Sequence, residues 1–159
     1  MQSRDLLLYA YEQIQGTLRR AVDGLPADRL STRVGPASNT IGWLAWHLLR
    51  VQDDHVAEVA GTEQVWTAGG WAARFDLPFE ASATGYGFSA DDVAAVRVDS
   101  ADLLLGYAAA VHEQTARFLR GLSVSETAEL LGRNDGAVRA LQYRALRTLA
   151  GLLPREAAA

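Results

Sequence analysis

Apolar residues recur three and four positions apart over most of this 159-residue chain, and this spacing constrains its fold more than any other feature. Such spacing places apolar side chains on one side of an α-helix, whereas a half-buried strand would alternate polar and apolar residues. No stretch shows the alternating pattern, and no internal repeat is visible. The sequence therefore predicts an all-α protein.

Capping residues and glycines indicate where the helices begin and end. Ser38 or Asn39 is expected to cap the second long helix, and Gly61 is expected to end it. Ser123 and Glu126 form an S-x-x-E pattern, which predicts a capping box at the start of a short helix. The expected helices cover residues 4–22, 40–60, 89–96, 101–122, 124–131 and 134–153.

Each of the three long helices has one apolar side, which is expected to face the core. On residues 4–22 this side carries Leu7, Tyr11, Ile14, Leu18 and Val22. On residues 40–60 it carries Ile41, Leu44, Leu48, Val51 and His55. On residues 101–122 it carries Leu104, Ala108, Val111, Thr115 and Phe118. Residues 62–88 lack a sustained period and are expected to form a long ordered loop with one helical turn.

The composition excludes several classes of protein. The chain has no cysteine, which rules out disulfides, thiolate zinc sites and cysteine nucleophiles. With 49% hydrophobic and 21% charged residues, it is expected to bury a core as one domain, alone or with a small appended module. No signal-peptide pattern and no long apolar run is visible, so a cytoplasmic protein without membrane association is expected.

The charges are distributed unevenly along the chain. Residues 1–115 carry 8 Arg against 15 acidic residues, whereas residues 116–159 carry 7 Arg against 4 acidic residues. The basic end also holds the two helices expected over 124–131 and 134–153. A tight turn with Gly132 joins them, as in a helix-turn-helix. The alternative is a plain helical hairpin that completes a bundle.

The last predicted helix has two different sides. At about 100° per residue, one side carries Val138, Leu141, Ala145, Leu149 and Leu152. The opposite side carries Gly136, Arg139, Ala140, Tyr143 and Arg147, with Arg144 on the flank. Small residues permit close approach to DNA and Arg side chains reach phosphates or guanine edges. This second side is therefore typical of a helix that enters the major groove.

Residues 121–153, GLSVSETAELLGRNDGAVRALQYRALRTLAGLL, resemble region 4 of extracytoplasmic-function sigma factors, the part that reads the promoter −35 element. The resemblance implies that Arg139, Ala140 and Tyr143 face bases. It also implies that Arg133, Arg144 and Arg147 face phosphates, and Asn134 belongs to the same DNA-binding set. DNA with a GGAAC-like element and RNA polymerase are the implied partners. Nothing in the chain resembles region 2, so a complete sigma factor is not expected.

Three earlier stretches resemble a DinB-type domain: NTIGWLAWHLLRVQDDHVAEVAG, QVWTAGGWAARFDLPF and TGYGFSADDVAAVRV. The resemblance covers about residues 5–120 and implies a four-helix bundle from a superfamily that includes thiol-dependent transferases and isomerases. Members often bind a divalent metal, such as zinc or nickel, through one His of the second helix and two ligands of the last helix. His47 matches the first of these ligands, whereas the expected last helix contains no His.

The other candidate ligands do not complete a metal site by their spacing. His47 and His55 lie eight residues apart, about 12 Å along a helix, which is too far to share one ion. Asp54 is similarly distant from His47, and His112 lies on another expected helix. His55 is predicted to be a hydrogen-bonded core residue and His112 to be half-exposed. The Asp53–Asp54 pair is predicted to be a solvated edge.

These observations predict a DinB-like up-down helical bundle over residues 1–120 and a sigma-region-4-like helix-turn-helix over residues 121–159. The favoured function is that of a DNA-binding regulatory protein rather than an enzyme. One alternative is a DinB-type metal-dependent thiol transferase or hydrolase-like protein with an incomplete metal site. Another is that the last helices only complete the bundle. Because a bundle without its fourth helix would expose an apolar side, a homodimer is also expected.

Overall fold

The computed structural model describes residues 3–33, 35, 38–123 and 126, and within these ranges it contains seven helices and no named strand. An isolated bridge pairs Arg33 with Thr40. The prediction of an all-α fold is therefore confirmed. The chain divides into two compact units, one of residues 12–118 and the other of Met1–Tyr11 with Leu119–Ala159. None of the helices in the described ranges is long and apolar enough to cross a membrane.

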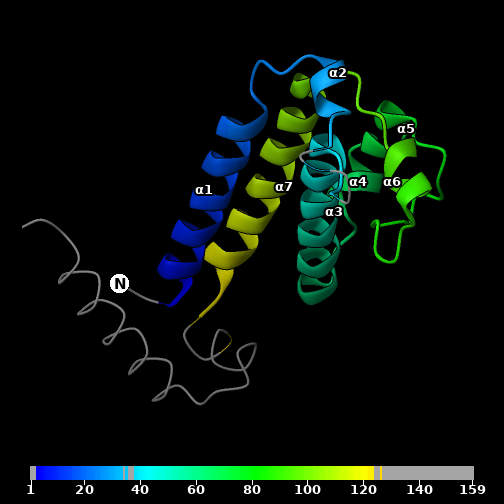
Figure 1. Cartoon of the computed structure of the whole chain (residues 1–159). Helices are drawn as coiled ribbons and strands as arrows, with labels where there is room; N and C mark the ends of the chain where they lie inside the picture. The colour runs from blue at the N-terminus through cyan, green and yellow to red at the C-terminus, as the bar shows by residue number, and fades with distance from the viewer. Residues whose placement is uncertain (1–2, 34, 36–37, 124–125, 127–159) are drawn as a thin grey trace, which may run out of the picture. The chain divides into compact units, whose positions relative to one another are not determined.

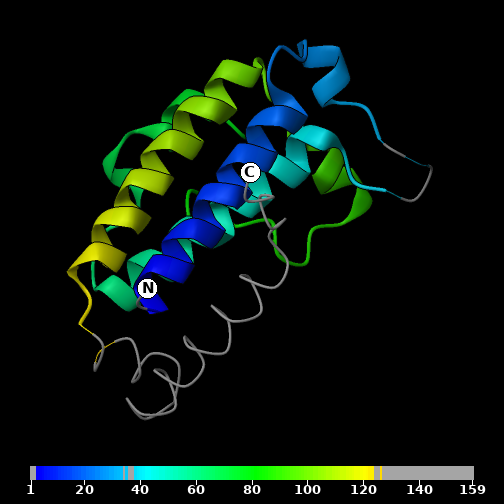
Figure 2. The ribbon, with the colours of Figure 1, turned by 90° about the vertical axis from the view of Figure 1, so that its left-hand side faces the viewer.

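Three long helices dominate the described residues: α1 (Ser3–Val22), α3 (Ile41–Ala60) and α7 (Ala101–Gly121). The three helices lie side by side, and α1 runs antiparallel to both α3 and α7 (Figures 1 and 2). Each of their ends lies within one residue of the end that the periodicity predicts. The long helices are therefore a local property of the sequence.

The ends of α3 follow the capping rules, with one difference from the prediction. Thr40, rather than Ser38 or Asn39, is the N-cap, because its hydroxyl accepts a hydrogen bond from the backbone N–H of Trp43 at 3.1 Å. Gly61 ends the helix in the left-handed conformation, with φ of 62°, as predicted. Both caps satisfy backbone groups that the helix itself leaves unpaired.

Two reciprocal capping boxes are present among the residues that the structure describes. At the start of α6 (Ala90–Ala95), the Ser89 hydroxyl accepts from Asp92 N at 3.2 Å and Asp92 Oδ2 accepts from Ser89 N at 2.9 Å. The Ser123 hydroxyl accepts from Glu126 N at 3.2 Å, and Glu126 Oε2 accepts from Ser123 N at 2.7 Å. Hydrogen bonds from serine hold the pKa of both carboxyl groups below its usual value. The box predicted at Ser123 is therefore confirmed.

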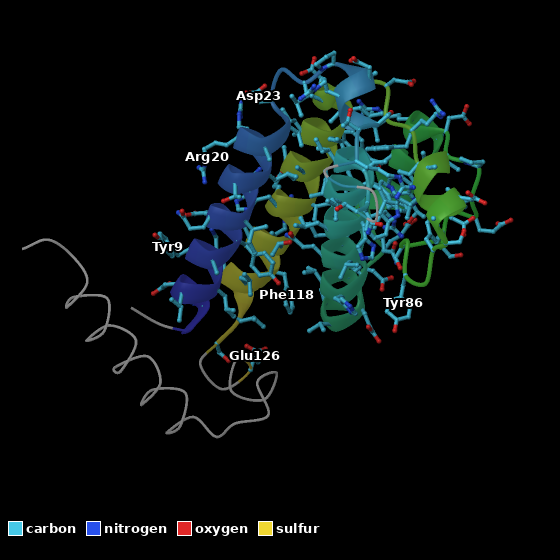
Figure 3. All side chains as sticks on the ribbon, viewed as in Figure 1. Tyr9, Arg20, Asp23, Tyr86, Phe118 and Glu126 are labelled. Carbon is cyan, nitrogen blue, oxygen red and sulfur yellow. The ribbon has the colours of Figure 1, made fainter. Side chains whose placement is uncertain are left out.

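The segment between α3 and α6 is more regular than predicted. Residues 62–88 contain two short helices, α4 (Val65–Ala68) and α5 (Trp71–Phe75), in place of one helical turn. A further short helix, α2 (Ala27–Leu30), lies in the connection between α1 and α3. Tyr86 projects from the segment into solvent and is 91% exposed (Figure 3). Three other aromatic residues, Trp66, Trp71 and Phe75, are buried and anchor the segment, and Phe79 and Phe88 are half-buried.

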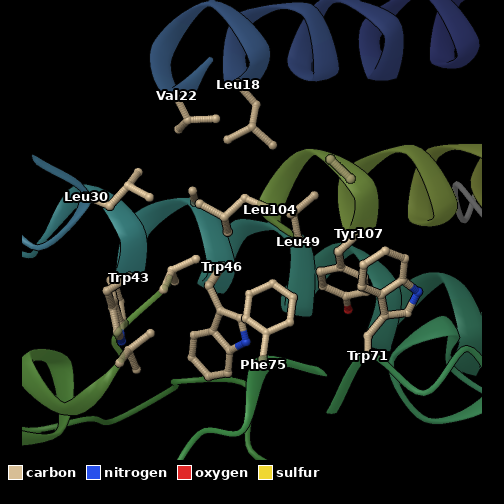
Figure 4. Packing of buried hydrophobic residues seen from close by; sticks show 14 of the residues in the cluster. Leu18, Val22, Leu30, Trp43, Trp46, Leu49, Trp71, Phe75, Leu104 and Tyr107 are labelled. Atoms are coloured by element: carbon tan, nitrogen blue, oxygen red, sulfur yellow. The ribbon is translucent and has the colours of Figure 1, made fainter. Parts of the chain in front are cut away.

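The predicted buried side is largely confirmed for α7, but for α1 it is confirmed only toward the carboxyl end. Leu18 and Val22 of α1 are buried, whereas Ile14 is 40% exposed. On α7, four of the five predicted residues are buried: Leu104, Ala108, Val111 and Thr115. Leu18, Val22 and Leu104 belong to one core cluster with aromatic residues that include Trp46 and Tyr107 (Figure 4).

The prediction for α3 is wrong about which side is buried. Leu44 and Leu48 are 46% and 39% exposed. The buried residues of α3 are Gly42, Trp43, Ala45, Trp46, Leu49, Arg50, Asp53, Val56 and Ala57. Trp46 packs against Trp66 and Phe88, at centroid distances of 6.2 and 6.0 Å. Because tryptophan buries more surface than leucine, contacts with residues 62–88 decide which side of α3 faces inward.

Candidate functional site

His47 lies on α3 against the last part of the 62–88 segment and is half-buried. Its Nδ1 lies 2.6 Å from the carbonyl oxygen of Thr84. A carbonyl only accepts, so Nδ1 carries the proton and donates. The imidazole also stacks on Trp43, with ring centroids 4.4 Å apart and ring planes 18° apart. These two contacts hold the ring in one orientation, and the lone pair of the neutral ring is on Nε2.

Gly85 allows the backbone to approach this ring closely. Its φ is +90°, in the region that favours glycine. A Cβ atom there would lie 2.9 Å from the ring of Trp46 and 3.0 Å from His47 Nδ1. Any side chain at this position would therefore displace the histidine or the tryptophan. The two glycines of TGYG mark a tight turn in the sequence, but they do not indicate that Gly85 lies against His47.

The orientation of His47 resembles that of a metal ligand, but the described residues do not complete a metal site. A backbone carbonyl that accepts from one imidazole nitrogen commonly orients a histidine whose other nitrogen binds metal. A catalytic zinc site typically has three protein ligands. Within the described ranges, no group of three or more His, Asp or Glu side chains could hold an ion. These ranges therefore supply one oriented nitrogen and do not fit a resident metal.

The other two histidines are not brought to His47. His55, predicted to lie in the core, is instead exposed, and its Nδ1 lies 3.9 Å from Glu58 Oε2. That prediction is wrong because His55 lies on the side of α3 that is not buried. His112 is half-buried on α7, as predicted, and its Nδ1 has no hydrogen-bond partner among the described residues.

Arg50, one turn beyond His47, lies at the centre of a buried polar network. Its side chain is 0% exposed, and Nη1 lies 3.6 Å from Asp53 Oδ2. Nη2 donates to Gln64 Oε1 at 2.9 Å, and Nε donates to the carbonyl oxygen of Ala83 at 3.2 Å. The guanidinium also lies over the ring of Trp66, 4.8 Å from its centroid. One arginine thereby connects α3 to both ends of the 62–88 segment.

Asp53 balances this charge and caps a neighbouring helix. Its side chain is 1% exposed, so the prediction of a solvated Asp53–Asp54 edge is wrong for Asp53. Oδ1 accepts from Val65 N at 2.9 Å and Oδ2 accepts from Trp66 N at 2.7 Å, at the start of α4. Because the negative charge lies at the amino end of a helix, the backbone dipoles there also favour it.

Tyr107 of α7 closes the network. Its hydroxyl donates to Asp53 Oδ2 at 2.7 Å and accepts from Arg50 Nη1 at 3.3 Å. Burial raises the pKa of Tyr107 far above its usual value, and the negative charge of Asp53 adds to this effect. The tyrosine therefore stays protonated at neutral pH. The network joins α3, α7 and residues 62–88.

This network was not predicted from the sequence, although one feature of it is visible there. Arg50 and Asp53 lie three residues apart on the helix, a spacing that lets opposite charges interact. Their partners, Gln64, Ala83 and Tyr107, are between 14 and 57 residues away. Only the folded arrangement brings these groups together.

The predicted DNA-binding residues lie outside the residues that the structure describes. They are Arg133, Asn134, Arg139, Ala140, Tyr143, Arg144 and Arg147. The described residues reach the Ser123–Glu126 capping box, which precedes them along the chain. Their role in binding DNA stays a prediction.

The helical bundle with its aromatic core agrees with a comparison of the sequence with known families. A family model described as the DinB superfamily matches residues 10–153, which is most of the chain. The chain belongs to the DinB superfamily. The match extends beyond the expected boundary at residue 120 and includes the residues that resemble sigma region 4.

A solved structure supports the assignment of the fold. The crystal structure of a conserved protein from Enterococcus faecalis superposes with a TM-score of 0.71 at 20% sequence identity. The similarity covers 77% of this chain and 72% of that one. At this level of identity, the likeness establishes the fold of this DinB-superfamily chain and not its activity.

A second kind of relative matches only a short part of the chain. The ECF RNA polymerase sigma factor BldN of Streptomyces coelicolor is 65% identical over 43 residues. These residues are 27% of this chain and 16% of the sigma factor, so the chain spans about a sixth of that protein's length. This DinB-superfamily chain therefore contains a short segment that is closely similar to part of a sigma factor.

Proposed function

We propose that this DinB-superfamily protein is a DNA-binding regulatory protein that contacts DNA through residues 121–153. The 65% identity with a sigma factor over 43 residues is the observation that carries this proposal. At 65% identity, the two sequences share most individual side chains of the segment and not only its helical periodicity. The residues proposed to contact DNA are Arg133, Asn134, Arg139, Ala140, Tyr143, Arg144 and Arg147.

Charge and capping support the proposal. Residues 116–159 carry 7 Arg against 4 acidic residues in a chain whose overall charge is −4, so positive charge is concentrated at this end. The box between Ser123 and Glu126 is formed, which favours a helix that starts where the helix-turn-helix pattern requires one.

Binding to a GGAAC-like duplex tests this function. With three or four phosphate contacts, the logarithm of the affinity should fall with the logarithm of salt with a slope of about 3. Affinity should be weak, because the acidic residues of 1–115 oppose approach to DNA. Fluorescence anisotropy with a labelled duplex measures the affinity. Repeating the titration over a ~10-fold range of salt, from about 20 to about 200 mM, gives the salt slope.

Two arginine variants separate base contacts from phosphate contacts. Arg139→Gln should change the preference between the GGAAC-like duplex and a scrambled duplex of the same length. Arg147→Gln should weaken binding to both duplexes equally and reduce the salt slope by about 1. At about 20 mM salt, charges are screened only beyond roughly 20 Å, so binding should be strongest there. No binding to either duplex under these conditions would contradict the proposed function.

A second candidate function is that of a metal-dependent DinB-type transferase, which the orientation of His47 favours. The Nδ1 proton is held by the carbonyl of Thr84, so Nε2 is the nitrogen that could bind an ion. In the described ranges, His47 does not belong to any group of three or more His, Asp or Glu side chains that could hold an ion.

For this second candidate we expect weak or no stoichiometric metal binding. Calorimetric titration with Zn²⁺ and Ni²⁺ should show no tight one-to-one event, because one histidine alone does not hold these ions against dialysis. His47→Ala is the matched variant, and it should titrate like the unmodified protein. Tight equimolar binding that His47→Ala abolishes would instead favour the transferase.

A further inference from the structure

Two consecutive carbonyl groups between α5 and α6 are held by side chains of α3. Arg50 Nε donates to the carbonyl oxygen of Ala83 at 3.2 Å, and His47 Nδ1 donates to the carbonyl oxygen of Thr84 at 2.6 Å. His47 and Arg50 lie three residues apart, so they are neighbours on one side of the helix. All four residues belong to the compact unit of residues 12–118. The histidine and the arginine therefore hold adjacent links of the same loop.

The backbone itself does not fix these two carbonyl groups. In the part of the chain that the structure describes, neither the Ala83 nor the Thr84 oxygen accepts from a backbone N–H group. The nearest turns are closed by Ala83 N and Phe88 N, which donate to the carbonyl oxygens of Glu80 and Gly85. Gly85, with a φ of +90°, lets the chain turn directly after Thr84. The direction of the Thr84 carbonyl therefore depends on the side chains that contact this stretch.

Arg50 is a rigid support for the Ala83 carbonyl. Its side chain is fully buried, and each of its three nitrogens has a partner. Nη1 contacts Asp53 and Tyr107, and Nη2 donates to Gln64. Because the guanidinium is planar, these partners at its far end also fix the direction of the Nε–H bond. The buried network thereby directs this bond at the Ala83 carbonyl.

Only one of the two contacts of His47 distinguishes its ring nitrogens. Stacking on Trp43 fixes the plane of the ring, but it is compatible with a proton on either nitrogen. The Thr84 carbonyl only accepts, so it selects the form with the proton on Nδ1. The position of this carbonyl therefore sets the tautomer of the histidine.

We propose that Arg50 is a positioning residue for His47. Arg50 holds the carbonyl of Ala83 and thereby fixes the adjoining carbonyl of Thr84. That carbonyl keeps the His47 imidazole in the Nδ1–H tautomer, with its lone pair on Nε2. A small molecule that contacts Nε2 meets a hydrogen-bond acceptor, so a hydroxyl or an amide N–H group suits this position. The inference goes beyond the proposed DNA-binding function and does not rest on it, because none of these residues lies in 121–153.

Nuclear magnetic resonance tests the proposal, because long-range proton–nitrogen correlations show which ring nitrogen of a histidine carries the proton. The chain has three histidines, and the signal that is absent from His47→Ala identifies His47. Spectra at about pH 9 report on neutral rings, since histidine commonly titrates between about pH 5 and 8. In the unmodified protein, His47 should be in the Nδ1–H tautomer.

Arg50→Lys is the decisive variant. It keeps a positive charge opposite Asp53, but a methylene group takes the place of the Nε–H that contacts Ala83. The ratio of the Nδ1–H to the Nε2–H tautomer of His47 should fall at least about fivefold, the effect of losing one ordinary hydrogen bond. The double variant Arg50→Met with Asp53→Leu should produce the same fall without leaving a buried charge. It gives the answer if Arg50→Lys does not fold.

Tyr107→Phe is the matched control. It removes the hydroxyl that contacts Asp53 and Arg50, but it leaves the bond between Arg50 and Ala83 in place. Thermal unfolding should show a lower Tm for Tyr107→Phe and Arg50→Lys alike, whereas the tautomer ratio should change only in the Arg50 variants. An unchanged ratio in a folded Arg50 variant would overturn the proposal. An equal change in Tyr107→Phe would also overturn it, because the tautomer would then follow stability and not the bond to Ala83.

Discussion

Asp53→Ala is expected to destabilise the protein by about 3–5 kcal/mol, one of the two largest effects of a single substitution that we expect. The change leaves the guanidinium of Arg50 buried without its counter-charge. It also removes the acceptor for the backbone N–H groups of Val65 and Trp66, and for the hydroxyl of Tyr107. Urea unfolding followed by far-UV circular dichroism measures the loss.

Two comparisons make this result specific to the buried pair. Asp54→Ala is the matched control, because Asp54 is half-buried and accepts a side-chain hydrogen bond from Gln64. It should cost about 1 kcal/mol or less. The double variant Arg50→Met with Asp53→Leu should cost less than Asp53→Ala alone, because it removes both charges together. A loss below about 1 kcal/mol for Asp53→Ala would contradict the network's role.

Trp46→Ala is expected to cost about 3–5 kcal/mol, because it opens a large cavity between α3 and residues 62–88. Trp46 is 1% exposed and packs on Trp66 and Phe88. Its ring lies among the aromatic side chains of the core (Figure 4). Because Gly85 contacts the same ring, the loss should also loosen the turn that holds His47. Urea unfolding measures the stability, and near-UV circular dichroism reports on the aromatic packing.

An exposed aromatic residue of the same segment provides the control for the prediction on Trp46. Tyr86→Ala removes another aromatic ring from the same segment, but Tyr86 is 91% exposed. Its effect should remain within about 0.5 kcal/mol. Trp46→Phe, which retains one ring, should fall between the two. A loss for Trp46→Ala no larger than that for Tyr86→Ala would show that the contacts of Trp46 contribute little.

Sequence reasoning located one residue of the candidate site and missed its setting. His47 follows from the resemblance to DinB-type domains, but its hydrogen bond to Thr84 and the close approach of Gly85 do not. Both depend on a turn 37 and 38 residues further along the chain. The pattern of one helix contains no information about which distant turn will pack against it.

What the sequence by itself determined is the set of long helices and their ends. Periodicity and capping act within a few residues, so α3, Gly61 and the Ser123–Glu126 box could be predicted from the chain alone.

Only the tertiary structure decided which side of α3 is buried. The aliphatic spacing favoured the side with Leu44, whereas the folded protein buries the side with Trp46 and Arg50. Burying an arginine is unfavourable unless a counter-charge and acceptors surround it. Asp53 supplies the counter-charge from the same helix, whereas the acceptors come from Gln64, Ala83 and Tyr107, which are distant in sequence. The choice between the two sides therefore depends on long-range contacts that no local pattern contains.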